Sequence, residues 1–146
     1  MLEQDAVFSK VSIIKNCLNT IREITGLDPR RLDDFIVQDV FVLNLQRAIQ
    51  AAIDIAHLLI SANGWRMPAA YRESFIVLNQ NGVIELACSE KMIKMTGFRN
   101  IAVHDYRQLS PVILKAILTG NLKDVESYYS AVLDYLKARP LPEGGA

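Results

Sequence analysis

Arg99, Asn100, His104 and Tyr106 lie within eight residues of one another, and their types point to chemistry on a phosphate. Arg99 supplies a guanidinium that can bind a phosphate, and His104 supplies an imidazole that exchanges a proton near neutral pH. A phosphate-binding cation and a proton carrier are the two groups needed to cleave RNA without a metal ion. The chain has only 2 histidines, which makes His104 a stronger candidate for catalysis.

Helical spacing limits how these residues can act together. Each residue turns a helix by about 100°, so Asn100 and His104 share one face, Arg99 and Tyr106 share another, and Arg99 lies about 140° from His104. Arg99 and His104 converge on one phosphate if the Arg99 side chain bends around the helix or if the helix is distorted near Gly97. They also converge if a second copy of the chain supplies the missing group, as a two-fold dimer would allow.

A structural interpretation competes with the catalytic one, because a single arginine on a helix is usually solvated and a single buried histidine is usually hydrogen-bonded. That interpretation fits His57 better than His104. Asp54 precedes His57 by three residues in an apolar segment, so we expect the two side chains to pair with each other.

Apolar periodicity predicts helices along the whole chain. One stripe repeats at spacings of four and three and comprises Val7, Val11, Ile14, Leu18 and Ile21. A second long helix is predicted over 39–62, and its broad apolar face indicates burial on more than one side. A helical turn is expected between them, over 30–34.

The second half of the chain predicts shorter helices. One begins near Tyr71 and ends at Asn81-Gly82, and another covers about 83–95. Gly97 is expected to be either a helix break or a point of close approach. Ser110-Pro111 is typical of a helix start, and the last helix follows Gly120. The fold class is therefore an all-α bundle of about four to six helices, with one domain over 1–139 and a flexible C-terminal tail over 140–146.

Composition narrows the function classes. The chain has 146 residues, 16 basic and 16 acidic side chains, and a formal net charge of zero, so any RNA would bind at a local site and not on a broad basic surface. No run approaches the roughly 20 apolar residues of a membrane span. Cys17 and Cys88 are isolated, which favours reduced thiols in a cytoplasmic protein. No metal-ligand or nucleotide-binding motif is present, so no metal and no cofactor is expected.

The segment Arg99-Asn100-x3-His104 resembles the catalytic motif of HEPN-domain ribonucleases. Its extension to Tyr106, R-x4-H-x-Y, resembles the HepT toxin branch of that superfamily. The segment that precedes it, Met95-Thr96-Gly97-Phe98, and the second-helix blocks at 43–49 and 51–56 agree with this branch. The resemblance covers about residues 5–138.

This resemblance implies a HEPN-like bundle that dimerises, or forms a higher oligomer, through the motif region. It also implies a metal-independent endoribonuclease toxin in which Arg99, Asn100 and His104 are catalytic and the RNA 2′-OH attacks the adjacent phosphate. Neither DNA nor a membrane is an expected partner. The implied protein partner is an MntA-type nucleotidyltransferase antitoxin that adenylylates Tyr106 and so silences cleavage.

The residues are also compatible with a different class of function. A non-catalytic HEPN module would have the same fold, and it would bind a nucleotide or support a partner nucleotidyltransferase. The presence of Arg99, Asn100 and His104 together favours the enzyme.

Overall fold

The computed structural model describes residues 3–104 and 109–141. Within these ranges the secondary structure is helical without a strand, which confirms the prediction of an all-α bundle. The elements in chain order are α1 (Glu3–Thr25), η1 (Pro29–Asp33, a 3-10 helix), α2 (Phe35–Asn63), α3 (Tyr71–Gln80), α4 (Leu86–His104), α5 (Pro111–Gly120) and α6 (Leu122–Ala138).

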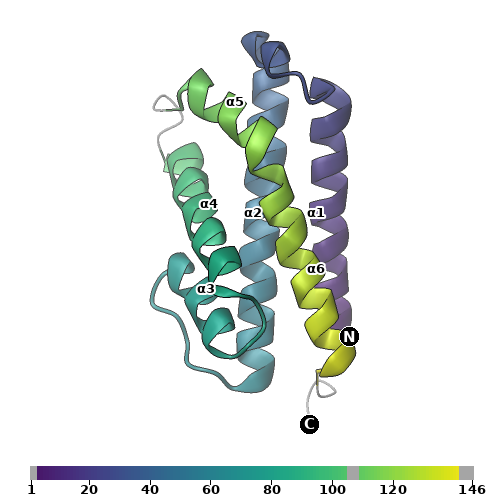
Figure 1. Ribbon diagram of the computed structural model, residues 1–146, viewed down its shortest axis with the longest axis vertical. Helices are drawn as coiled ribbons and strands as arrows, with labels where there is room; N and C mark the ends of the chain where they lie inside the picture. The colour runs from purple at the N-terminus through teal and green to yellow at the C-terminus, as the bar shows by residue number, and fades with distance from the viewer. Residues whose placement is uncertain (1–2, 105–108, 142–146) are drawn as a thin grey trace.

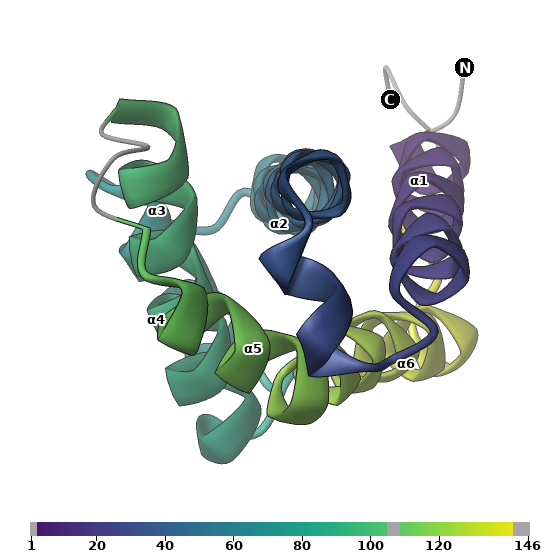
Figure 2. The same cartoon turned by 90° about the horizontal axis from the view of Figure 1, so that it is seen from above.

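Helix α2 runs through the middle of the bundle (Figure 1). Seen from above, it lies between α1 on one side and the α3–α4 pair on the other (Figure 2). It also contacts α6, while α5 packs against η1 and α6 at one end. The prediction that α2 is buried on more than one side is confirmed. Small buried residues on α2, such as Ala48, Ala52 and Ala56, let the neighbouring helices approach closely.

Helix α2 begins at Phe35, so the predicted start at residue 39 was wrong. The Asp34 carboxylate caps the helix, because it accepts hydrogen bonds from the backbone N–H groups of Ile36 at 2.8 Å and Val37 at 3.2 Å. Phe35 and Ile36 are exposed. The first turn therefore lacks the apolar periodicity from which the start of the helix was predicted.

Helix α4 continues through Gly97, so the alternative of a helix break was wrong. The alternative of a close approach is not supported either, because no described atom beyond the adjoining backbone of α4 lies within 4 Å of a Cβ placed at Gly97. A glycine inside a helix costs about 1 kcal/mol relative to alanine. Burial of the neighbouring side chains of Met95, Phe98 and Ala102 in the core offsets that cost. The residues from Arg99 to His104 consequently lie on one uninterrupted helix.

The predicted starts of the last two helices are confirmed. The Ser110 hydroxyl accepts a hydrogen bond from the Val112 N–H at 3.2 Å, and Pro111 occupies the first turn of α5. Helix α6 ends at Ala138, next to the predicted domain boundary. The Leu141 N–H then donates to the Gln4 side-chain oxygen at 3.0 Å. The predicted flexible tail falls mainly on residues 142–146, which lie outside the described residues.

Tyr128 provides a test of how α6 is fixed to α2. Its fully buried hydroxyl donates to the Ala52 carbonyl at 2.8 Å, and its ring meets Phe75 edge-on. We expect Tyr128→Phe to lower the free energy of unfolding by about 1 kcal/mol, because one buried hydrogen bond is lost while the ring is kept. Urea denaturation measures this change.

The matched control is Tyr129→Phe. Tyr129 is on the same helix, and its hydroxyl makes no hydrogen bond to a described residue, so its removal should leave the unfolding free energy nearly unchanged. Equal losses in the two variants would show that the Tyr128 hydroxyl does not stabilise the packing of α6 on α2.

Candidate functional site

The described motif residues all lie in the last two turns of α4. Arg99 is half-buried and faces α2, whereas Asn100 and His104 are exposed. Because α4 is continuous, Asn100 and His104 lie on the same face, as their spacing of four predicts. The exposed imidazole and carboxamide are accessible to a polymeric substrate.

Three contacts from three different helices hold the Arg99 guanidinium. Its Nε–H donates to the Gln50 side-chain oxygen on α2 at 3.1 Å, and its Nη1 donates to the Asn100 side-chain oxygen at 3.2 Å. The guanidinium carbon lies 5.1 Å from the centre of the Tyr71 ring on α3, within cation–π range. Two of the five N–H donors of the guanidinium are used in this way. The other three, which no described residue accepts, can bind a phosphate.

Further polar contacts hold Gln50, the residue on α2 that accepts from Arg99. The Gln50 side-chain amide donates to Asp54 Oδ1 at 3.0 Å, and Lys10 on α1 lies 3.1 Å from Asp54 Oδ2. A continuous chain of polar groups therefore runs from Lys10 on α1 across α2 to Arg99 on α4.

His57 has a different partner from the one predicted. Its Nε2 lies 2.9 Å from the Ser74 hydroxyl on α3, while the Asp54 carboxylate interacts with Gln50 and Lys10. The predicted His57–Asp54 pair was wrong, because side chains three residues apart on α2 turn toward different neighbouring helices. The His57 ring also lies 5.8 Å from that of Tyr71.

Sequence reasoning missed Gln50 and Tyr71 as neighbours of Arg99. A usable signal was present for Gln50. The apolar segment 48–60 is interrupted at Gln50, Asp54 and His57, and this spacing of four and three places all three on one face of the helix. No comparable pattern singles out Tyr71, which is the first residue of α3.

Among the described residues, no hydrogen bond joins His104 to Arg99 or Asn100. Arg99 donates to Gln50 on α2 and to Asn100, which shares a face of α4 with His104. The helix through Gly97 is uninterrupted, which removes one of the three predicted ways for the two residues to converge. Tyr106 lies outside the described residues, so the predicted face shared by Arg99 and Tyr106 stays a prediction.

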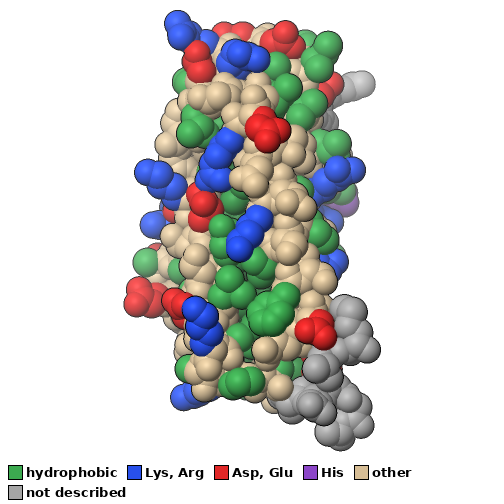
Figure 3. Space-filling view, turned by 90° about the vertical axis from the view of Figure 1, so that its right-hand side faces the viewer, with side chains coloured by type: hydrophobic (Ala, Val, Ile, Leu, Met, Phe, Trp, Pro, Cys, Tyr) green, Lys and Arg blue, Asp and Glu red, His purple; other side chains and the backbone are tan. Residues whose placement is uncertain are grey.

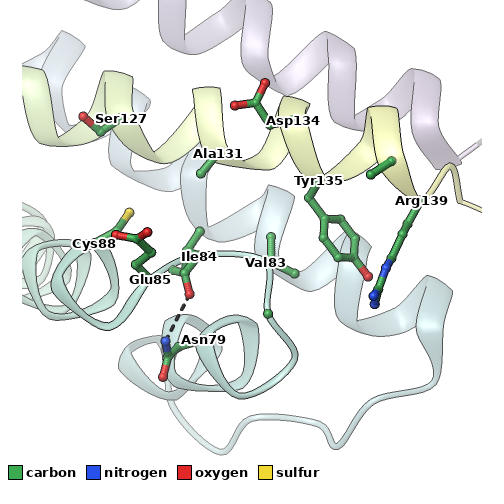
Figure 4. Close-up of a pocket in the computed structure, with 12 residues that line it drawn as sticks. Asn79, Val83, Ile84, Glu85, Cys88, Ser127, Ala131, Asp134, Tyr135 and Arg139 are labelled. Carbon is green, nitrogen blue, oxygen red and sulfur yellow. Dashed lines mark hydrogen bonds between the residues drawn. The ribbon is translucent and has the colours of Figure 1, made fainter.

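A cavity of about 810 Å³ lies away from the motif, between the α3–α4 connection and α6 (Figure 4). Its charged lining residues are Glu85, Asp134 and Arg139. Burial, together with the nearby Asp124, raises the pKa of the Cys88 thiol, which also lines this cavity, so this cysteine is a poor nucleophile at neutral pH. The cavity contains no motif residue and no histidine, so it does not suit RNA cleavage.

The surface charge agrees with a local site. On the side that includes α1, basic and acidic side chains are interspersed and form no broad basic patch (Figure 3). Some of them pair across helices, as Arg22 does with Glu126. Among the described residues no group of three or more His, Cys, Asp or Glu side chains is placed to hold a metal ion. None of the described helices is long and apolar enough to cross a lipid bilayer.

Comparison with known proteins identifies the family. The ribonuclease HepT-like family matches residues 14–132. The chain belongs to the HepT-like ribonuclease family. This confirms the resemblance inferred from Arg99, Asn100, His104 and Tyr106.

Relatives of known sequence and structure agree with this HepT-like assignment. The mRNA nuclease HepT of Shewanella oneidensis is 37% identical over 134 residues, which are 92% of this chain and 98% of the relative. A solved structure of the tri-AMPylated Shewanella oneidensis HEPN toxin in complex with MNT antitoxin is 36% identical, with a TM-score of 0.84 over 89% of this chain and 98% of that one. YutE from Bacillus subtilis, at 13% identity, has the same fold, with a TM-score of 0.84 over 97% of this chain and 95% of its own.

Proposed function

We propose that this HepT-like chain is a toxin of a toxin–antitoxin pair and cleaves RNA in the cytoplasm without a metal ion. The observation that carries the proposal is the Arg99 guanidinium, which is anchored by Gln50 and Asn100 and has three N–H donors that no described residue accepts, on a helix that also presents His104. The activity of the 37% identical mRNA nuclease HepT supports RNA as the substrate class.

The chemistry follows from the residue types. His104 takes the proton from an RNA 2′-OH, whose oxygen then bonds to the adjacent phosphorus while the bond from phosphorus to the 5′-oxygen breaks. The leaving 5′-oxygen takes a proton from water, and the products are a 2′,3′-cyclic phosphate and a 5′-hydroxyl. Arg99 stabilises the extra negative charge on the phosphoryl oxygens, and Asn100 fixes the guanidinium through its hydrogen bond to Nη1.

The proposed active site is shared between two copies of the chain. Within one copy, Arg99 is anchored to α2 by Gln50, and no hydrogen bond between described residues joins it to the exposed His104. In a two-fold dimer formed through α4, Arg99 of one copy and His104 of the other can face the same phosphate.

A nucleotidyltransferase antitoxin is the proposed partner, and Tyr106 is the proposed modified residue. The Shewanella oneidensis relative is AMPylated and in complex with MNT antitoxin. Tyr106 follows Arg99 by seven residues in the sequence. AMP on this tyrosine would bring a negatively charged phosphate and a bulky nucleoside close to the proposed RNA-binding cation, and so would repel the RNA backbone.

The first test is cleavage of a synthetic RNA oligonucleotide in the presence of EDTA. His104→Ala should lower the rate by about 10²- to 10⁴-fold, because the proton-transfer group is lost. A substrate with a single 2′-deoxy sugar at the cleavage site should resist cleavage, because it lacks the nucleophile. Lys94→Ala, an exposed basic residue on the same helix, serves as the control and should cleave normally.

Full cleavage by His104→Ala would refute the catalytic assignment. Nucleotide binding by the unmodified protein without any RNA cleavage would favour the alternative of a non-catalytic HEPN module.

The second test concerns the shared site. Arg99→Ala and His104→Ala should each be inactive alone. When the two variants are unfolded together and refolded, mixed dimers should regain activity, because one of their two sites then combines an intact Arg99 with an intact His104. The RNA cleavage rate of the mixture measures this gain. No gain, despite mixed dimers seen by native mass spectrometry, would show that each copy contains its own complete site.

The third test is the intact mass of the protein after co-expression with its nucleotidyltransferase. We expect a gain of one or more AMP units, mapped to Tyr106 by peptide sequencing, and slower RNA cleavage by the modified protein. Tyr106→Phe should gain no AMP and should stay active, while Tyr135→Phe, on α6, should be modified normally. AMP on another residue, or unchanged cleavage after modification of Tyr106, would contradict the proposed regulation.

A further inference from the structure

We propose that Gln50 is a positioning residue, which orients Arg99 through an uncharged acceptor and so keeps the full positive charge of the guanidinium for the phosphate. The inference rests on the proposed function of Arg99 in RNA cleavage. Its starting point is the hydrogen bond from Arg99 Nε to Gln50 Oε1 at 3.1 Å, which joins α4 to α2 across 49 residues of sequence.

Asp54 determines which way the Gln50 amide points. A carboxylate only accepts hydrogen bonds, so the Gln50 NH₂ group must face Asp54 Oδ1, 3.0 Å away. The Gln50 oxygen is then directed at Arg99. The opposite orientation would place the amide oxygen against the carboxylate and the NH₂ group against the guanidinium, and both contacts would be repulsive. Asp54 therefore fixes the amide so that it accepts from Arg99.

Lys10 neutralises the charge of Asp54 at the far end of this chain of contacts. Its ammonium lies 3.1 Å from Asp54 Oδ2, on the side away from Gln50. The carboxylate thus has a cation of its own on α1, and Arg99 has a neutral amide next to it. A carboxylate in direct contact with Arg99 would form a strong charge-assisted pair and would compete with the RNA phosphate for the same cation.

Tyr71 completes the positioning of Arg99 without using a donor. The ring packs against the guanidinium at 5.1 Å, and it limits the rotation of a long side chain that is otherwise costly to order. The amide, the ring and Asn100 together hold Arg99 before substrate arrives. The entropic cost of ordering the Arg99 side chain then falls on folding of the protein and not on reaching the transition state of the reaction.

The test compares two substitutions at Gln50 in steady-state cleavage of the RNA oligonucleotide by the full chain. Gln50→Leu removes the acceptor, and we expect kcat to fall between about tenfold and 10²-fold, because a misplaced catalytic group costs that much. Gln50→Glu has the same shape and strengthens the contact with Arg99, although its second oxygen faces Asp54 Oδ1, where the amide NH₂ group donated. We expect it to lose at least as much activity as Gln50→Leu, and cooperative melting checks that the bundle still folds despite this repulsion.

The two variants together separate a positioning role of Gln50 from a merely structural one. If the role were merely structural, the tighter contact in Gln50→Glu would preserve activity. The control is Gln80, whose oxygen accepts a hydrogen bond from Arg66 at 3.3 Å on the surface, away from the motif. Gln80→Leu and Gln80→Glu should leave kcat unchanged.

The inference would be overturned if Gln50→Glu, or Gln50→Leu that melts cooperatively, cleaved RNA at a rate within about twofold of that of the unchanged protein. This outcome counts against the inference alone if Arg99→Ala is inactive. Normal cleavage by Arg99→Ala would instead refute the proposed function. The two failures are therefore distinguishable in the same experiment.

Discussion

Burial of α2 is the constraint on which the rest of the bundle depends, because this helix packs against α1, α3, α4 and α6. Its apolar side chains fill the centre of the molecule, and several of its polar side chains lie on a strip that its neighbours leave partly uncovered. Gln50, Asp54 and His57 lie on that strip, and each is hydrogen-bonded to a neighbouring side chain. The site forms on this strip, where polar groups are partly solvated and still reach three other helices.

The network around Arg99 shows how a chain without net charge can present a cation at one local site, as the proposed RNA cleavage requires. The positive charge is concentrated at one side chain, and the carboxylate nearest to it in the network is paired with Lys10. A surface with interspersed basic and acidic side chains then does not weaken phosphate binding at the site. Arg99 acts at contact distance, while more distant surface charges are screened by salt. Substrate attraction over long range is correspondingly small for such a protein.

Much of the fold could be predicted because the signals were local. The stripe from Val7 to Ile21 is buried as its spacing predicts, and Ser110-Pro111 begins α5. The errors have equally local causes. The first turn of α2 has exposed apolar residues, so only the Asp34 cap shows where it begins. Gly97 is an unfavourable helix residue whose cost is met by the burial of its neighbours, which the local sequence does not reveal.

The sequence by itself determined the family, the all-α class and the motif of Arg99, Asn100 and His104, because helical periodicity and motif spacing involve residues close together in the chain. Only the tertiary structure decided what surrounds these side chains. Arg99 meets Gln50 and Tyr71, and His57 meets Ser74 instead of Asp54. These contacts join residues on different helices. They depend on how α2, α3 and α4 pack together, and helix packing is set by the shapes of whole faces and not by any short pattern along the chain.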